Sequence, residues 1–277
     1  MITDWDEAYS NVGHVPDAMA YPPRWRAAAQ AYRDEMRAAG RLEADLAYGP
    51  APRQRLDIFH PKGTPQGLAV FMHGGYWLRF DKSVWSHLAA GAVAVGWAVC
   101  LPSHRLAPEV RVGQISFDAG RAISFAAARV AGPVRLAGHS AGGHLAARMV
   151  TIGSPLGAAL RGRIAHVLSI SGVHDLRPLL RTEMNTTIGL DAAEARSESP
   201  ALLEPLDGCR LTAWVGASEL PEFIRQADLL ANIWTGCGAA TRVVHDPGRH
   251  HFSVIEALTE ADAPLTAAFT GGDGWAG

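Results

Sequence analysis

Short apolar runs alternate with helical stretches along most of the chain, and this pattern constrains the fold more than any other feature. The runs occupy residues 67–73, 96–102, 133–139, 164–172, 210–216 and 240–246. Between them, segments near 84–94, 115–130, 141–153 and 222–235 have helical composition. Continuous apolar strands separated by helices are typical of a parallel sheet that is buried on both faces. The sequence therefore predicts an α/β fold with helices on both sides of a sheet.

The N-terminal part of the chain adds a helix and a hairpin to this pattern. Residues 22–39 have helical composition and end at Gly40. Residues 42–49 and 53–61 alternate in polarity around a Gly-Pro turn, which predicts an antiparallel hairpin. We therefore expect about eight strands, with the first pair antiparallel to the rest. We expect one domain over residues 1–277, in which 1–40 and the irregular segment 173–208 contribute to a small cap.

Composition and charge narrow the classes of function. The chain has 25 Lys and Arg against 27 Asp and Glu, and this net charge of −2 without a basic run gives no reason to expect nucleic acid or membrane as a partner. No apolar run reaches the roughly 18 residues of a membrane span, and the N-terminus lacks a secretory pattern. The three cysteines lack CxxC spacing, so we expect a cytoplasmic protein. We expect a small-molecule substrate and no metal or cofactor, and leave a homodimer open.

Residues 138–144, GHSAGGH, place a serine between two glycines at the end of a predicted strand. A helix is expected directly after it. In such a turn Gly138 and Gly142 allow the backbone to pass closely, which exposes the Ser140 hydroxyl above the sheet and points a helix N-terminus at it. This context favours a nucleophile over a chance glycine-rich turn. We expect His139 and His144 to pack near the turn and not to act as the base.

Residues 73–77, HGGYW, follow another predicted strand and indicate an oxyanion hole. Hydrolysis of an acyl compound places negative charge on the former carbonyl oxygen, so backbone N–H groups must already point there. Two glycines let the chain turn its amides inward. We expect the donors to be the N–H groups of Gly74, Gly75 and Ala141, the last being the residue after the nucleophile. A plain Gly-Gly turn would explain the glycines but not the preceding histidine.

A serine nucleophile needs a base and an acid that orients the base. In folds of this kind the three residues follow the chain order Ser, Asp or Glu, His, so the acid and the base are expected after the last two strands. The last strand precedes His250 and His251, and we prefer His251 because it directly precedes a predicted helix that begins with phenylalanine. Glu219 lies in the loop after the penultimate strand and is the preferred acid. Glu222 at the next helix start suits the helix dipole without a catalytic task. Asp175 is the chief rival of Glu219.

With these residues in place, the sequence resembles the kynurenine formamidase (arylformamidase) group of α/β-hydrolases, near the hormone-sensitive-lipase-like esterases. The matching pieces are HGGYW at 73–77, RLAPEVR at 105–111, GHSAGGHLA at 138–146, SGVHDLRPL at 171–179, VGASELPEFIRQ at 215–226 and HHFSVIEAL at 250–258. The resemblance implies the α/β-hydrolase fold, with the acid at Glu219 and the base at His251. Animal members carry aspartate at the acid position, and many relatives carry tyrosine where this chain has His104.

The resemblance also implies a reaction, the hydrolysis of N-formyl-L-kynurenine to formate and L-kynurenine in tryptophan catabolism. An aryl amide would suit Tyr76 and Trp77 as walls of the substrate pocket, and a place in the hydrophobic core is the alternative for both rings. Arg79 and Arg177 are candidate partners for the carboxylate of the substrate. One alternative is a carboxylesterase for small acyl esters, which uses the same triad and differs only in its pocket. A non-catalytic ligand-binding member of the fold is disfavoured, because Ser140, Glu219 and His251 are all present.

Overall fold

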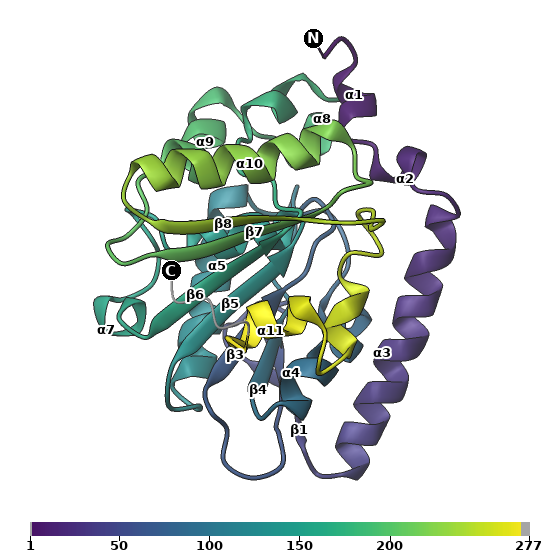
Figure 1. The fold of residues 1–277 in the computed structure, drawn as a ribbon, viewed down its shortest axis with the longest axis vertical. Helices are drawn as coiled ribbons and strands as arrows, with labels where there is room; N and C mark the ends of the chain where they lie inside the picture. The colour runs from purple at the N-terminus through teal and green to yellow at the C-terminus, as the bar shows by residue number, and fades with distance from the viewer. Residues whose placement is uncertain (1, 273–277) are drawn as a thin grey trace.

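The computed structural model describes residues 2–272, which form an eight-stranded sheet between two layers of helices (Figure 1). The strand order across the sheet is β1-β2-β4-β3-β5-β6-β7-β8. The strands are β1 (Leu42–Ala47), β2 (Arg55–Phe59), β3 (Leu68–Met72), β4 (Ala98–Pro102), β5 (Val134–His139), β6 (Ile164–Ile170), β7 (Arg210–Gly216) and β8 (Ala240–Asp246). The predicted α/β-hydrolase fold class, with about eight mostly parallel strands, is confirmed.

The strand directions differ from the sequence-based expectation at one edge of the sheet. Strands β3 to β8 run parallel, whereas β2 is antiparallel to both β1 and β4. Because β1 reverses again, only β2 opposes the rest, and the expectation of an opposed pair is wrong. In the centre, Met72 at the end of β3 pairs with Gly138 near the end of β5. The loops that follow these two strands therefore begin side by side.

The helices cover both faces of the sheet (Figure 1). Side chains of α5, α6 and α10 share one apolar cluster with the sheet, and those of α3, α4 and α11 share the other. The helices are α1 (Trp5–Ala8), α2 (Asn11–His14), α3 (Tyr21–Ala38), α4 (Ala90–Ala94), α5 (Val112–Ala127), α6 (Ala141–Arg148), α7 (Ala158–Arg161), α8 (Asn185–Ile188), α9 (Ala192–Ser197), α10 (Pro221–Gly236) and α11 (Pro264–Thr270).

Two predicted helices are not continuous α-helices in the structure. The segment near 84–94 consists of the 3₁₀ helices Lys82–Val84 and Ser86–Ala89, followed by the short α4. The helix expected directly after His251 is replaced by turns and the 3₁₀ helix Glu256–Thr259. Both segments bury apolar side chains against the sheet, so their composition resembles that of a packed helix although the backbone turns more tightly.

Helix α3 is fixed to the body of the protein by buried charges and stacked rings. Its Arg33 forms an ion pair with Asp57 of β2, and Lys82 Nζ lies 2.9 Å from the same carboxylate. The Trp25 ring packs on Trp85 with the ring centroids 4.7 Å apart. Because an unpaired buried Asp57 would be costly, this set of charges holds α3 in one position.

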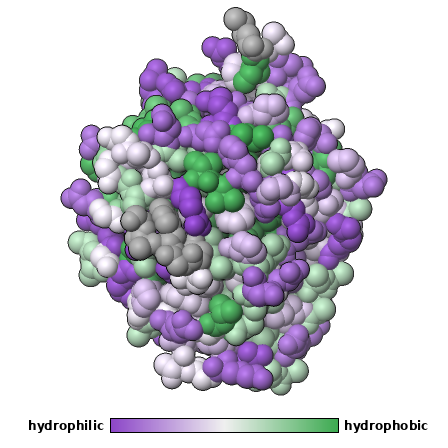
Figure 2. Space-filling view, viewed as in Figure 1, coloured by the Kyte–Doolittle hydropathy of each residue, from purple (hydrophilic) through white to green (hydrophobic). Residues whose placement is uncertain are grey.

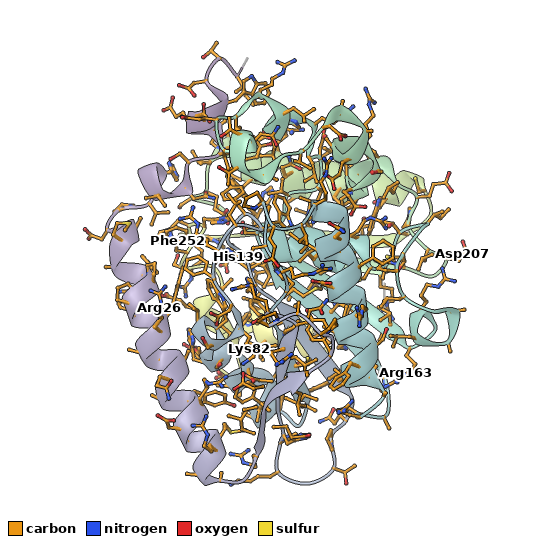
Figure 3. The ribbon with its side chains drawn as sticks, turned by 180° about the vertical axis from the view of Figure 1, so that it is seen from behind. Arg26, Lys82, His139, Arg163, Asp207 and Phe252 are labelled. Carbon is orange, nitrogen blue, oxygen red and sulfur yellow. The ribbon has the colours of Figure 1, made fainter. Side chains whose placement is uncertain are left out.

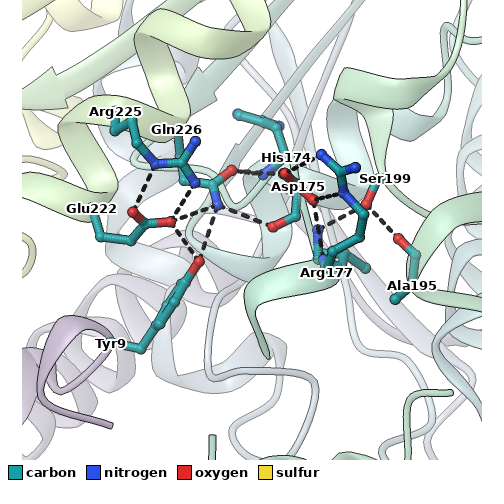
Figure 4. Close-up of polar contacts among 10 residues, drawn as sticks. Tyr9, His174, Asp175, Arg177, Ala195, Ser199, Glu222, Arg225 and Gln226 are labelled. Atoms are coloured by element: carbon teal, nitrogen blue, oxygen red, sulfur yellow. Dashed lines mark hydrogen bonds and ion pairs between the residues drawn. The ribbon is translucent and has the colours of Figure 1, made fainter. Parts of the chain in front are cut away.

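The N-terminal segment and residues 173–208 lie together at one end of the molecule, where α1, α2 and α8 are seen at the top of Figure 1. The Tyr9 hydroxyl donates to Glu222 Oε1 of α10 at 2.6 Å and accepts from Gln226 Nε2 at 3.1 Å (Figure 4). The Glu183 N–H donates to Asp6 Oδ1 at 2.7 Å. These bonds join the first turns of the chain to segments that are nearly 200 residues away.

The surface carries mixed polarity. On the face shown in Figure 2, hydrophilic and hydrophobic residues are intermingled. Within residues 2–272, no helix combines the length and apolar character required to cross a membrane.

Three histidines, His73, His144 and His174, are buried in the folded protein. Burial lowers the pKa of His73 to about 4 and the pKa values of His144 and His174 to about 3, from an ordinary value of 6.5. These imidazoles are therefore neutral in the folded protein at neutral pH. His144 Nε2 donates to the Glu198 carbonyl at 2.7 Å, a bond that the neutral ring can make.

We expect the free energy of unfolding to fall as the pH is lowered from 7 to 5. In the unfolded chain each imidazole binds a proton below pH 6.5, whereas the buried rings do so only near pH 3 to 4, so acid favours the unfolded state. Each such histidine contributes about 2 kcal/mol to this loss. Denaturant unfolding of His144→Gln, which keeps a donor, should show a smaller pH dependence than the wild type. An unchanged pH dependence would contradict this origin.

Candidate active site

Ser140 occupies a sharp turn between β5 and α6. Its backbone has φ 56° and ψ −121°, a conformation that non-glycine residues rarely adopt. A Cβ at position 138 would lie 2.0 Å from the Gly142 carbonyl oxygen, and a Cβ at 142 would lie 2.0 Å from that of Met72. Glycine is therefore required at both positions. The turn places the serine above the sheet edge at the N-terminus of α6, as expected of a nucleophile.

The backbone of the HGGYW loop lies against this serine. A Cβ at Gly74 would lie 3.0 Å from Ser140 Cβ, and Gly75 has φ 114°. His73 Nδ1 donates to the Gly74 carbonyl at 2.8 Å, which fixes the orientation of the peptide that carries the Gly75 N–H. Within residues 2–272, the N–H groups of Gly74, Gly75 and Ala141 donate to no acceptor. They remain available to an oxyanion.

His251 and Glu219 form a buried hydrogen-bonded pair. Glu219 Oε2 accepts from His251 Nδ1 at 2.7 Å, and their side chains are 0% and 4% exposed respectively. The other carboxylate oxygen, Oε1, accepts from the Gly216 N–H at 2.8 Å and from the Ser171 hydroxyl. The Glu219 carboxylate thus accepts a hydrogen bond from the imidazole, while two further donors hold it in place. Because Nδ1 is used in this bond, Nε2 of His251 remains to exchange a proton.

The His251 ring lies between two other rings. The His139 and Phe223 ring centroids are each 4.5 Å from that of His251. His139 Nε2 donates to the His251 carbonyl at 2.8 Å, so the residue before the nucleophile holds the backbone of the imidazole loop. Burial lowers the pKa of His139 well below its ordinary value, which keeps this ring neutral. His139 therefore has a positioning role, beyond the packing expected from the sequence.

The alternatives to Glu219 as the acid and to His251 as the base have other partners. Asp175 forms a two-point ion pair with Arg177, whose Nε and Nη2 donate at 2.9 and 2.8 Å. Arg177 is therefore occupied, and neither residue lines the cavity beside Ser140. His250 contacts the Tyr21 hydroxyl through Nε2 at 3.1 Å. Glu222 pairs with Arg225 and Tyr9, and His144 packs beneath the turn.

A cavity of about 840 Å³ opens beside Ser140 and His251. Aromatic side chains form much of its wall: Tyr9, Trp25, Tyr76, Phe80, Trp85 and Phe252. In Figure 3, Phe252 lies between His139 and α3, the helix that carries Arg26. The volume and lining are typical of a site for a small organic molecule.

Trp77 does not line this cavity, which corrects its predicted role as a pocket wall. Its ring is 1% exposed and meets the His144 ring edge to face at a centroid distance of 5.1 Å. The neighbouring Tyr76 does line the cavity, and its hydroxyl donates to the Tyr9 carbonyl at 2.7 Å. His104 is buried in a stack on His73, away from the cavity.

Sequence reasoning assigns residues 1–40 and 173–208 to a small cap but misses the side chains with which they line the cavity. Residues of α1, α2 and α3 line it, together with residues 182–187. It also missed Ser171 as a donor to the Glu219 carboxylate. Among the described residues, no group of three or more His, Cys, Asp or Glu side chains is arranged to hold a metal ion.

Comparison with known proteins agrees with this architecture. Residues 69–252 match the model of a family described by the alpha/beta hydrolase fold. The chain belongs to this family. Kynurenine formamidases from Salmo salar and Danio rerio are 28% and 29% identical to it, each over 80% of this chain and 79% or 78% of their own length. The resemblance predicted from the sequence is therefore confirmed, and the chain is a serine hydrolase-type enzyme.

Solved structures show the same fold. A candidate thioesterase from Silicibacter sp. TM1040 superimposes with a TM-score of 0.91 at 44% identity, covering 96% of this chain and 99% of that one. An esterase from Pyrobaculum calidifontis superimposes with a TM-score of 0.67 at 20% identity, covering 93% and 94%. The second likeness concerns the fold alone.

We expect Glu219→Gln to reduce kcat for a chromogenic ester by about 10³- to 10⁴-fold, because the amide cannot balance an imidazolium and can fix the wrong tautomer. The matched variant Asp175→Asn removes a carboxylate whose partner is Arg177 and should change kcat by less than about threefold. Steady-state rates of both purified variants test the assignment. A larger loss at Asp175 would assign the acid there instead.

We expect His139→Leu to lower kcat by about 10- to 100-fold with little change in KM, since the His251 loop loses its anchor and small displacements of a base are costly. His139→Gln restores a donor and should recover part of the rate. Initial rates measured over a range of ester concentrations separate kcat from KM. Equal rates for the leucine variant and the wild type would refute the positioning role.

Proposed function

We propose that this enzyme hydrolyses an aryl formamide, N-formyl-L-kynurenine, to formate and L-kynurenine. The observation that carries the proposal is the buried Glu219–His251 pair beside Ser140 at one end of an aromatic-lined cavity. The formyl group needs little room, whereas the aryl group needs a wall of rings, and the cavity offers such a wall. The kynurenine formamidases among the relatives, which match over four fifths of the chain, support the same substrate.

The proposed chemistry begins with attack of Ser140 on the formyl carbon. His251 Nε2 takes the hydroxyl proton, while Glu219 holds Nδ1 and balances the positive charge. The N–H groups of Gly74, Gly75 and Ala141 stabilise the oxyanion of the tetrahedral intermediate. The C–N bond then breaks, and His251 returns the proton to the departing aryl amine. Water, activated by His251, cleaves the formyl-serine and releases formate.

A second candidate function is hydrolysis of small esters or thioesters. It is favoured by the 44% identical structural relative described as a candidate thioesterase, and the same serine, imidazole and backbone donors would serve it. The two functions differ in the leaving group and in how the cavity holds it.

The substrate proposal is tested by comparing three leaving groups on one enzyme preparation. We expect kcat/KM for N-formyl-L-kynurenine to exceed the values for p-nitrophenyl acetate and an acetyl thioester by about tenfold or more, because the cavity binds the aryl part of the formamide. Ser140→Ala should reduce every rate by about 10⁴-fold or more. Fast ester or thioester cleavage with negligible formamide cleavage would overturn the proposal and favour the second function.

A further inference from the structure

The cavity beside Ser140 is lined by charged side chains of both signs, which come from different segments of the chain. Arg26 from α3 and Arg79 from the loop after β3 line one part of it. Their elements are packed together, since the ring of Trp85 contacts both Trp25 and Phe80, with centroid distances of 4.7 and 5.6 Å. Arg26 and Arg79 therefore lie on neighbouring segments of the cavity lining, and we refer to them as the cationic wall.

The opposite sign is found where α1 meets residues 182–187. Asp6 and Glu183 line the same cavity, and the Glu183 N–H donates to Asp6 Oδ1 at 2.7 Å. This hydrogen bond uses a backbone donor, so neither carboxylate is neutralised by it. We refer to Asp6 and Glu183 as the acidic wall.

The two arginines have no protein partner. Within residues 2–272, neither the Arg26 nor the Arg79 guanidinium makes an ion pair or a side-chain hydrogen bond, although both are exposed at the cavity. Arg24, two residues before Arg26 on the same helix, faces elsewhere and pairs with Glu256 at 3.6 Å. The cationic wall thus keeps its hydrogen-bonding capacity for a ligand.

A buried amide also lines this cavity. Asn11 of α2 lines the cavity, is only 5% exposed, and its Oδ1 is buried without a hydrogen-bond partner among the described residues. Burying a polar atom without a partner is unfavourable, so this atom is expected to have a partner in a ligand complex. Asparagine can accept from an ammonium group and donate to a carboxylate.

We propose that Asn11, the cationic wall and the acidic wall form a subsite for a zwitterionic α-amino acid group at the end of the substrate that does not react. The carboxylate binds Arg26 and Arg79, the ammonium group faces Asp6 and Glu183, and Asn11 completes the hydrogen bonds. This inference rests on the proposed function for the identity of the reacting group. It selects amino-acid formamides over simple aryl formamides through groups remote from Ser140.

Calorimetric titration of the wild-type protein tests the subsite without any requirement for turnover. The probes are L-kynurenine, 2-aminoacetophenone, which lacks the amino-acid group, and 4-(2-aminophenyl)-4-oxobutanoate, which keeps only the carboxylate. We expect L-kynurenine to bind at least about tenfold more tightly than 2-aminoacetophenone, in line with charge-assisted hydrogen bonds to both ends of the zwitterion. Equal affinities would overturn the inference.

Substitutions of the lining residues test which wall binds the carboxylate and which binds the ammonium group. Arg26→Gln combined with Arg79→Gln should weaken both carboxylate-bearing probes by about tenfold and leave 2-aminoacetophenone unchanged. Asp6→Asn keeps an acceptor for the Glu183 N–H and should weaken the binding of L-kynurenine only. Asn11→Leu should weaken the binding of L-kynurenine more than that of the oxobutanoate. Arg24→Gln is the matched control and should have no effect. An equal effect of the control, or equal losses for all three probes, would refute the assignment.

Turnover separates this inference from the proposed function. Cleavage of N-formyl-L-kynurenine and N-formyl-2-aminoacetophenone with equal kcat/KM would support formamide hydrolysis and overturn the subsite. Tight, Arg-dependent binding of L-kynurenine without any formamide cleavage would support the subsite and overturn the proposed function.

Discussion

The close approach of α6 to the ends of β3 and β5 is the constraint on which the rest of the site depends. Gly138 and Gly142 leave no room for a Cβ, and Ser140 adopts a backbone conformation that costs about 1–3 kcal/mol in a non-glycine residue. The surrounding sheet and helix are fully buried and hold this turn in place. Because Gly74 packs directly on the serine, the same contact places the backbone donors beside the hydroxyl.

The imidazole and carboxylate come from the neighbouring part of the sheet. Strand β7 ends at Gly216, whose N–H donates to Glu219, and Ser171 follows β6 and donates to the same carboxylate. His139 of β5 holds the His251 backbone from below. Four consecutive strands, β5 to β8, thus supply or anchor the side chains. The alignment of their ends at one edge, a general property of parallel sheets, is the reason that residues far apart in sequence meet here.

The sequence predicted the parts of this arrangement that depend on local pattern. Six of the eight strands are visible as apolar runs, because parallel strands covered by helices on both sides need apolar residues on both faces. The glycine spacing around Ser140 similarly reports a steric requirement. Trp77 was misplaced because Tyr76 and Trp77 both have positive φ, at 51° and 59°, and the loop turns the second ring into the core. No periodicity encodes such a turn in two consecutive aromatic residues.

The contacts that hold the expected cap segments at the cavity were not predictable from local pattern, because they join residues far apart in the chain. The bond between Tyr9 and Glu222 joins positions 213 residues apart, and short helices such as α1 have little apolar periodicity of their own. The polar network around Gln226 extends this contact to Asp175 (Figure 4).

The contact of Tyr9 with α10 can form only late in synthesis, because its two sides are far apart in the chain. Tyr9 cannot bind its partners on α10 until the chain through position 226 has been synthesised. The turn between β5 and α6 precedes α10 in the chain, so Ser140 is synthesised before the cavity beside it can be completed. His251 lies later still in the chain, so the cavity wall around Tyr9 can form before the imidazole proposed to activate Ser140 is present.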